Sequence, residues 1–216
     1  FEPVPIDEVA WDWQLSHEPL IIENHEPLVK ANFYPEKIVT APEYFEQGIP
    51  GTLMSTYIRK GVYDCLLSAA DRLPSGYKFV LLDVWRSNKA QQSLVDILKR
   101  QLSQLYPELS EPALMKRVLV TVAPPSHDLE KPSPHNTGGA VDLSIVDEQG
   151  EPLAFGTDFD DHTEKARTSY YEEQLENGRT LTPDEELYLN NRRLLFGLMT
   201  EAGFTNYTDE WWHFDY

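Results

Sequence analysis

The sequence predicts an α+β fold, in which a single domain spans residues 1–216 and helices flank a mainly antiparallel central sheet. Three observations support this prediction. Helices and strands occupy separate segments, and tight turn signals such as "DEQG" at 147–150 lie beside the strands. The 216 residues are 41% hydrophobic, which is enough to bury a sizeable core. No interdomain linker, low-complexity tract or repeat architecture divides the chain.

Proline dominates the first part of the chain. Residues 1–50 carry much of the proline and little periodicity, so we expect a loop-rich arm that wraps around the core. A helix is predicted over about 62–73, where the apolar residues follow helical spacing. The apolar, β-rich stretch "YKFVLLDVW" at 77–85 predicts a strand that ends at Arg86.

The middle of the chain holds two more helical patterns and one β-rich pattern. Ser87 can cap a helix whose apolar residues recur at three- and four-residue steps up to Pro107. A second amphipathic segment covers about 111–117. The stretch "RVLVTVAPP" at 117–125 predicts a strand that two prolines stop.

Strict alternation predicts a strand at 140–146, "AVDLSIV". Its branched apolar side chains share one face, whereas Asp142 lies on the other. A long helix is predicted over about 183–202, with Leu187 and three later leucines on its inner face. The last stretch, "DEWWHFDY", predicts a strand at the end of the chain.

The charge balance limits the classes of partner. Lysine and arginine number 18 and aspartate and glutamate 36, which gives a formal net charge of −18. Such a surface repels phosphate backbones and anionic membranes, so we expect no nucleic-acid partner. No apolar run reaches membrane-spanning length, and the first residues lack the features of a signal peptide. We expect a cytoplasmic protein, the alternative being a periplasmic or secreted one whose leader has been removed.

The stretch "SPHNTGGAVDLSI" at 133–145 places ligand-type side chains inside an apolar run. Burying an unpaired carboxylate is costly, so Asp142 requires a partner. Gly138 and Gly139 allow a sharp turn that brings His135 back beside Asp142. One nitrogen and one oxygen donor suit zinc, which in catalytic sites takes three protein ligands and leaves a position for water. The third ligand must come from another part of the chain.

The best candidate for that ligand is His213. It lies in the apolar, aromatic stretch "EWWHF", whereas the other histidines occupy polar stretches. Glu210 would then lie near the metal without binding it, as a general base requires. Strand alternation puts Glu210 and His213 on opposite faces, so either Glu210 precedes the strand or a bulge separates them.

These residues resemble the S-x-H-x-x-G-x-A-x-D and E-x-W-H motifs of the D-alanyl-D-alanine-cleaving zinc peptidases. The stretch "GTDFDD" at 156–161 is similar to the G-x-x-F-D segment of the dipeptidase branch, which includes the vancomycin-resistance dipeptidases. The order and spacing of "DVWRSNKAQ", "NNRRLLFGLMTEAGF" and "EWWH" also fit that branch, from about Asn32 to the end. The resemblance implies a hedgehog/DD-peptidase-like fold and a bacterial enzyme of peptidoglycan metabolism.

The resemblance also implies a metal centre and its catalytic group. His135, Asp142 and His213 match the zinc ligands, with one ion per chain. Glu210 matches the catalytic acid/base.

Three more residues match the family's substrate contacts. Arg86 matches the arginine that stabilises the tetrahedral oxyanion. Without the resemblance, Arg86 is interpreted as an ordinary surface arginine. Ser133 and Asp160 match positions that hold the two ends of the dipeptide, and Asp160 would pair with the substrate ammonium. Without the family pattern, the acidic run around Asp160 reads as a solvated turn.

The function that the resemblance implies is zinc-dependent hydrolysis of the small dipeptide D-alanyl-D-alanine to free D-alanine. One alternative keeps the zinc site and changes the substrate: a D,D-carboxypeptidase or a peptidoglycan endopeptidase. Another is a non-catalytic zinc-binding interaction module. The segment "VWRS" lacks the proline that follows this arginine in many dipeptidases, and "RS" with a following glutamine also occurs in the related carboxypeptidases, so the sequence leaves the substrate open.

Overall fold

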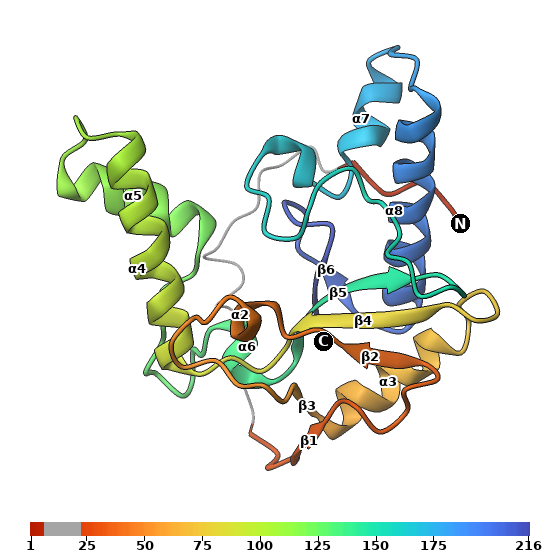
Figure 1. Cartoon of the computed structure of the whole chain (residues 1–216), viewed down its shortest axis with the longest axis horizontal. Coiled ribbons are helices and arrows are strands. Elements are labelled where there is room, and N and C mark those ends of the chain that lie inside the picture. Colours follow the sequence, from red (N-terminus) through yellow and green to blue (C-terminus); the bar gives the residue numbers. More distant parts are fainter. Residues whose placement is uncertain (7–22) are drawn as a thin grey trace.

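A five-stranded sheet forms the centre of the molecule (Figure 1). The computed structural model describes residues 1–6 and 23–216. In the strand order β2-β4-β5-β7-β6, β2 pairs with β4 in parallel, and the other neighbours are antiparallel. The predicted α+β class with a mainly antiparallel sheet is confirmed. The strands are β2 (Ile38–Thr40), β4 (Lys78–Asp83), β5 (Ala140–Val146), β6 (Thr205–Asn206) and β7 (His213–Asp215).

Helices and a small second sheet surround this centre. The helices are α2 (Glu43–Glu46), α3 (Lys60–Ala70), α4 (Asn88–Leu105), α5 (Glu111–Thr121), α6 (Pro134–Thr137), α7 (Tyr170–Glu176) and α8 (Pro183–Glu201), with a 3-10 turn η1 (Glu164–Ala166). The second sheet pairs β1 (Leu28–Lys30) with β3 (Tyr57–Arg59). No helix in the described part of the chain combines the length and apolar character needed to span a bilayer.

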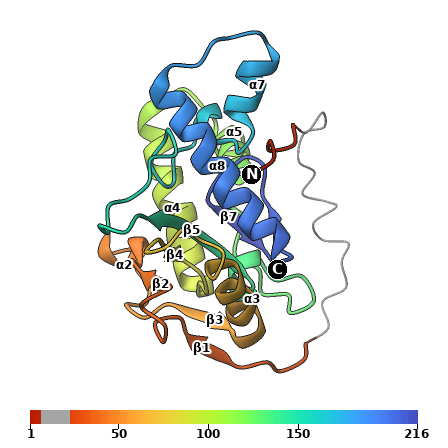
Figure 2. The ribbon, with the colours of Figure 1, turned by 90° about the vertical axis from the view of Figure 1, so that its right-hand side faces the viewer.

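The main core lies between one face of the central sheet and the helices α3 and α8, which lie close together in Figure 2. Phe79 of β4 lies opposite Ile145 of β5, and Leu81 lies opposite Leu143; all four side chains are fully buried. Because successive strand residues face opposite ways, this arrangement turns Asp142 to the other face, as the alternation predicts.

The predicted strand at 117–125 is wrong, because helix α5 continues to Thr121. Its β-branched residues favour a strand, but packing decides. Leu114 and Val118, one helical turn apart, are buried, and Val118 packs against Val95 and Leu98 of α4. The two helices therefore form a hairpin, on the side of the molecule away from α7 and α8 in Figure 1.

The N-terminal arm is more regular than its prolines predict. Residues 7–22 lie outside the described part of the chain. Beyond them, the arm contributes β1 to the small sheet, β2 to the edge of the central sheet, and the short helix α2. Backbone pairing of β1 with β3 and of β2 with β4 overrides the local proline signals.

Helix α8 confirms the predicted long helix, but one of the leucines expected on its buried face is exposed. Leu195 and Leu198 are buried, whereas Leu187 is 51% exposed. The buried stripe runs instead through Leu189 and includes Arg192, which is 1% exposed. The guanidinium of Arg192 donates to the backbone carbonyls of residues 155, 165 and 167, so α8 anchors the loops that lead toward the site.

A capping box begins α8, and its loss should be measurable. The Oγ1 atom of Thr182 accepts from the Glu185 N–H, and the Glu185 carboxylate accepts from the Thr182 N–H at 2.9 Å. We expect Thr182→Ala to lower the free energy of unfolding by about 1 kcal/mol in urea titrations. Ser110 begins α5 without a side-chain cap bond, so Ser110→Ala is the control and should cost less than about 0.5 kcal/mol. Equal losses would contradict the assignment.

Candidate metal centre and catalytic cleft

Three neighbouring strands carry a row of ionisable side chains to one place. Asp142 of β5 lies opposite Asp83 of β4 on one side and opposite His213 of β7 on the other. A register shift between Leu81 and Asp83 brings Asp83 into this row. The first and last strand of the row are far apart in sequence, so only the folded sheet makes them neighbours.

The fourth member, His135, enters from the short helix α6 just before β5. Gly138 ends that helix with φ of +76°, a conformation that glycine adopts readily, so the chain reverses there as expected. The Nδ1–H group of His135 donates to the Val84 carbonyl at 2.7 Å. Because a carbonyl only accepts, this bond fixes the tautomer and leaves Nε2 with a lone pair that faces the strands.

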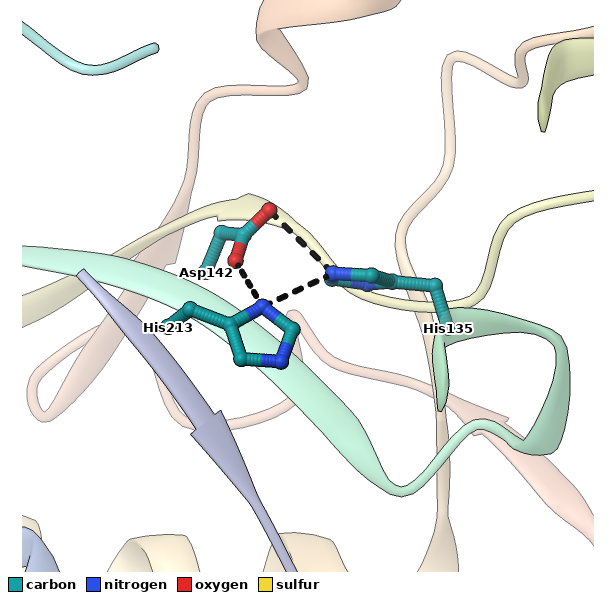
Figure 3. Close-up of side chains that lie close together, drawn as sticks. All are labelled: His135, Asp142 and His213. Carbon is teal, nitrogen blue, oxygen red and sulfur yellow. Dashed lines mark hydrogen bonds and ion pairs between the residues drawn. The ribbon is translucent and has the colours of Figure 1, made fainter. Parts of the chain in front are cut away.

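His135, Asp142 and His213 form a closed triangle of donor atoms (Figure 3). The Nδ1 atom of His213 lies 2.9 Å from Oδ1 of Asp142 and 3.2 Å from Nε2 of His135. The third side, from His135 Nε2 to Asp142 Oδ2, is 3.4 Å. Tetrahedral bonds of about 2.0–2.1 Å place ligand atoms roughly 3.3 Å apart, so the triangle has the size that zinc requires.

The types of donor atom also suit a cation. His135 Nε2 and both Asp142 oxygens are acceptors, and all three residues are buried. A single shared proton can satisfy only one pair of these atoms, whereas a cation at their centre contacts every member. The residues present therefore fit a zinc ion by size, donor type and orientation.

Neighbouring groups keep Asp142 ionised and orient the ring of His213. Burial opposes the charge of Asp142, but His135 and His213 outweigh it and hold the pKa of this carboxyl well below its usual range. The Nε2 atom of His213 lies 3.3 Å from Oδ1 of Asp215, two residues along the same strand. This carboxylate orients the ring so that Nδ1 faces the triangle.

Glu210 lies beside the triangle without belonging to it. Its Oε2 atom is 3.9 Å from Nδ1 of His213, and the side chain is 20% exposed. The strand β7 begins only at His213, so Glu210 precedes the strand, and the His213 N–H donates to the Glu210 carbonyl. The sequence left open whether Glu210 precedes the strand or a bulge separates it from His213, and the structure shows that Glu210 precedes the strand. Burial raises the pKa of Glu210 to about 8, with Asp142 and Asp160 adding to the rise.

Arg86 follows β4 and is 8% exposed. Its Nε donates to Asp83 at 2.9 Å, one terminal nitrogen lies 2.8 Å from the same oxygen, and the other donates to Gln91 at 3.0 Å. Burial disfavours the cation, but Asp83, Tyr44 and Asp142 outweigh it and raise its pKa above the ordinary value. Each terminal nitrogen carries a second N–H, and these donors remain for an oxygen in the cleft.

Asp160 also lines the cleft, from the loop before η1. Its backbone has φ of +63°, which is uncommon for a residue other than glycine and marks a position held by its surroundings. The Tyr44 hydroxyl donates to its Oδ1 at 2.9 Å. Burial raises the pKa of Asp160, and His162 and Tyr44 partly offset that rise.

Ser133 begins helix α6 and is 5% exposed. Its hydroxyl donates to the Asn136 side chain, which in turn donates to the Arg86 carbonyl. The Ser133 oxygen therefore retains lone pairs for accepting a hydrogen bond, while its own proton is already used.

All seven residues predicted from the sequence line one cleft of about 300 Å³. This cleft lies against the sheet face opposite the main core, and α4 forms one of its sides. The structure thus brings together every predicted site residue, from positions that span more than half of the chain. The members are Arg86, Ser133, His135, Asp142, Asp160, Glu210 and His213.

A family model described as D-ala-D-ala dipeptidase, of the M15 peptidases, matches residues 58–216 of this chain. The chain belongs to the D-Ala-D-Ala dipeptidase family. Members are metallopeptidases, so this protein is a hydrolase. The D-alanyl-D-alanine dipeptidase of Synechocystis sp. (strain ATCC 27184 / PCC 6803 / Kazusa) is 31% identical over 202 residues, which cover 88% of this chain and 81% of that protein.

Other relatives are more distant or cover less. The D-alanyl-D-alanine dipeptidase of Escherichia coli (strain K12) is 30% identical over 141 residues, 65% of this chain and 56% of that protein. The vancomycin-resistance D,D-pentapeptidase VanY, solved as a mutant in complex with Zn(II), aligns with a TM-score of 0.40 and 16% identity over 76% of this chain and 75% of its own. The LdcB LD-carboxypeptidase aligns with a TM-score of 0.42 and 18% identity, over 89% of this chain and 70% of its own.

Four residues that support this dipeptidase-family site were missed in the sequence. Asp83 and Gln91 accept hydrogen bonds from Arg86, and Asp215 lies beside the His213 ring. Tyr44 donates to Asp160, and its ring lies 5.0 Å from the Arg86 guanidinium. Asp83, a carboxylate inside an apolar strand pattern, gave the same signal as Asp142 and could have been found. Tyr44 lies in the proline-rich arm and gave no signal.

Proposed function

We propose that this chain is a zinc-dependent dipeptidase that hydrolyses free D-alanyl-D-alanine to two molecules of D-alanine. The observation that carries the proposal is that one cleft holds a zinc-sized donor triangle, a carboxyl group beside it, and the oppositely charged side chains of Arg86 and Asp160. The names of the relatives from Synechocystis and Escherichia coli support the choice of substrate.

His135, Asp142 and His213 would hold one zinc ion through the atoms that face one another in Figure 3. Bound there, zinc would polarise the scissile carbonyl and lower the pKa of a water molecule toward about 7. The three side chains supply two neutral nitrogens and one anion. This set leaves a net positive charge at the centre, where negative charge develops during hydrolysis.

Glu210 is the group that moves the proton. Its Oε2 atom takes a proton from the attacking water as the water oxygen bonds to the carbonyl carbon, and later gives that proton to the amine that leaves. Its position near, but outside, the donor triangle suits this role. Arg86 offers its free N–H groups to the oxygen that becomes negative, and Asp83 and Gln91 keep these groups in place.

Asp160 is the group that selects a short substrate. A free α-amine is cationic at neutral pH, so a carboxylate favours it and disfavours the neutral amide of a longer peptide. Tyr44 occupies one oxygen of Asp160, which leaves the other for the ammonium. Ser133 lines the same cleft and would contact the dipeptide as well.

The test compares free D-Ala-D-Ala with N-acetyl-D-Ala-D-Ala, using zinc-loaded enzyme and measuring released D-alanine. We expect hydrolysis of the free dipeptide alone. Asp160→Asn should lower kcat/KM for the free dipeptide by about 10–100-fold, because the ammonium loses its charged partner. Asp158→Asn, an exposed aspartate of the same loop, is the matched control and should leave kcat/KM unchanged.

Other outcomes of that test would assign other functions. Hydrolysis of the acylated peptide would indicate a carboxypeptidase or an endopeptidase and would remove Asp160 from substrate selection. Zinc binding without hydrolysis of any peptide would indicate a non-catalytic zinc module.

Asp215 should set zinc affinity through His213. We expect Asp215→Ala to weaken zinc binding by about 10–100-fold in competition with a chromogenic chelator, because the His213 ring loses the group that orients it. Asp215→Asn keeps a hydrogen-bond acceptor and should lose less. An affinity unchanged by Asp215→Ala would show that packing alone orients the ring.

A further inference from the structure

An apolar wall continues the cleft away from the catalytic residues. Leu94, Ile97 and Leu98 of α4 line the cleft, together with Ile49 after α2 and Val122 after α5. We call these five side chains the apolar wall. None of them takes part in metal binding, proton transfer or charge stabilisation as described above; Ile49, Leu94 and Leu98 are buried in packed clusters, and Ile97 and Val122 are partly exposed.

The apolar wall meets Asp160 at the ring of Tyr44. Tyr44, Ile49 and Leu94 form one buried cluster, with Ile97 packed against it. The hydroxyl at the far end of the same ring donates to Asp160. The carboxylate that would bind the substrate ammonium is thus one side chain away from the apolar wall.

This adjacency specifies which part of a dipeptide reaches the apolar wall. The ammonium and the side chain of an N-terminal residue are bonded to the same carbon atom. A residue whose ammonium meets Asp160 therefore places its side chain among the groups around that carboxylate, and the apolar wall is one of them. The residues that α4 contributes to the cleft include no charged side chain. Of its two glutamines there, Gln91 accepts a hydrogen bond from Arg86, and Gln101 is exposed.

We propose that the apolar wall is a specificity subsite for the side chain of the dipeptide's N-terminal residue, and that it favours a branched apolar side chain over the methyl group of alanine. The proposal rests on the proposed function, because it uses Asp160 as the ammonium partner. Ile97 and Val122 are the partly exposed members of the apolar wall; a methyl group leaves their surface in contact with water, whereas a leucine side chain covers it. The cleft volume of about 300 Å³ falls at the lower end of the range for drug-sized ligands, which leaves room for that side chain.

Binding to an inactive, zinc-loaded Glu210→Gln enzyme tests the subsite apart from catalysis. Calorimetry compares D-Ala-D-Ala, D-Leu-D-Ala and D-Asn-D-Ala, in which asparagine is closer in size to leucine than alanine is, but is polar. We expect D-Leu-D-Ala to bind about tenfold more tightly than the other two, since even one methylene in an apolar pocket changes affinity by about tenfold or more. Equal or tighter binding of D-Ala-D-Ala, or no binding of any dipeptide, would overturn the proposal.

Substitutions in the same background locate the subsite. Ile97→Phe fills the space beside the half-buried Ile97 and should remove the preference for D-Leu-D-Ala. Ile97→Ala removes the contact by a different route and should reduce the same preference, which keeps the test valid if Ile97→Phe does not fold. Gln92→Ala, on the exposed side of α4, is the control. A preference that survives both Ile97 variants would place the subsite elsewhere and overturn the proposal.

The failure of the subsite and that of the proposed function can be told apart by turnover of the unmodified enzyme. Hydrolysis of D-Ala-D-Ala without tighter binding of D-Leu-D-Ala keeps the dipeptidase function and overturns the subsite. Tight binding of D-Leu-D-Ala that depends on Ile97, without hydrolysis of any dipeptide, keeps the subsite and overturns the dipeptidase function.

Discussion

Glu210→Gln is expected to lower kcat for D-Ala-D-Ala by about 10³-fold while the protein still binds one zinc ion per chain. Glutamine has nearly the size of glutamate but cannot take a proton from water, so the change removes the base and leaves the cleft intact. Because Glu210 lies outside the donor triangle, the zinc content, measured by atomic emission, should not fall. The KM should change far less than kcat.

Glu148→Gln provides the control for this prediction. Glu148 is an exposed glutamate in the turn after β5, so its replacement should leave kcat within about twofold. Turnover retained in zinc-loaded Glu210→Gln would assign the proton transfer to another group. Loss of zinc together with turnover would show instead that Glu210 is a ligand.

His135→Ala is expected to abolish both zinc binding and hydrolysis. Two donors are fewer than a catalytic zinc site requires, and the Val84 carbonyl also loses its partner. Zinc titration with a chromogenic chelator should show no bound equivalent at concentrations that saturate the unmodified protein. The variant should regain neither property when zinc is added in excess.

His127→Ala is the matched control for the loss of a histidine. His127 is exposed and does not line the cleft, so zinc content and activity should stay unchanged. Because His135 is 5% exposed, a circular dichroism melt distinguishes loss of zinc from loss of fold, and His213→Gln gives a second route to the same result. Stoichiometric zinc in folded His135→Ala would remove this residue from the metal centre.

Much of the site could be predicted because its chemistry conflicts with its local sequence. A histidine, two glycines and an aspartate inside an apolar run are unfavourable unless something binds them. The structure shows that Asp142 and His213 are direct neighbours across β5 and β7, which explains why the aspartate is tolerated there. Glu210 lies in a turn before β7, on the side of His213. The sequence could not predict this turn, because a bulge inside the strand would agree with the same residues equally well.

Helix α5 shows the limit of local patterns. The run of β-branched residues at 117–125 favours a strand, yet the helix persists to Thr121. Burial of Val118 against α4 contributes more than the intrinsic preference of these residues for a strand, which spans only about 1 kcal/mol. The helix α4, which carries three residues of the apolar wall, was predicted, whereas the position of Val122, which follows α5, was hidden from the sequence.

The sequence by itself determined the α+β class, the strands that carry the ligand-type residues and, through the family motifs it contains, seven of the residues that line the cleft. His135, Asp142 and His213 stand out in the sequence because each is a polar group in an apolar stretch, whereas Arg86, Ser133 and Asp160 were identified only through the family motifs. Only the tertiary structure decided which groups hold those residues in place: Tyr44 for Asp160, Asp83 for Arg86, and Asp215 for His213. Hydrogen bonds and ion pairs depend on atoms a few ångströms apart, and packing of the sheet and the arm sets those separations.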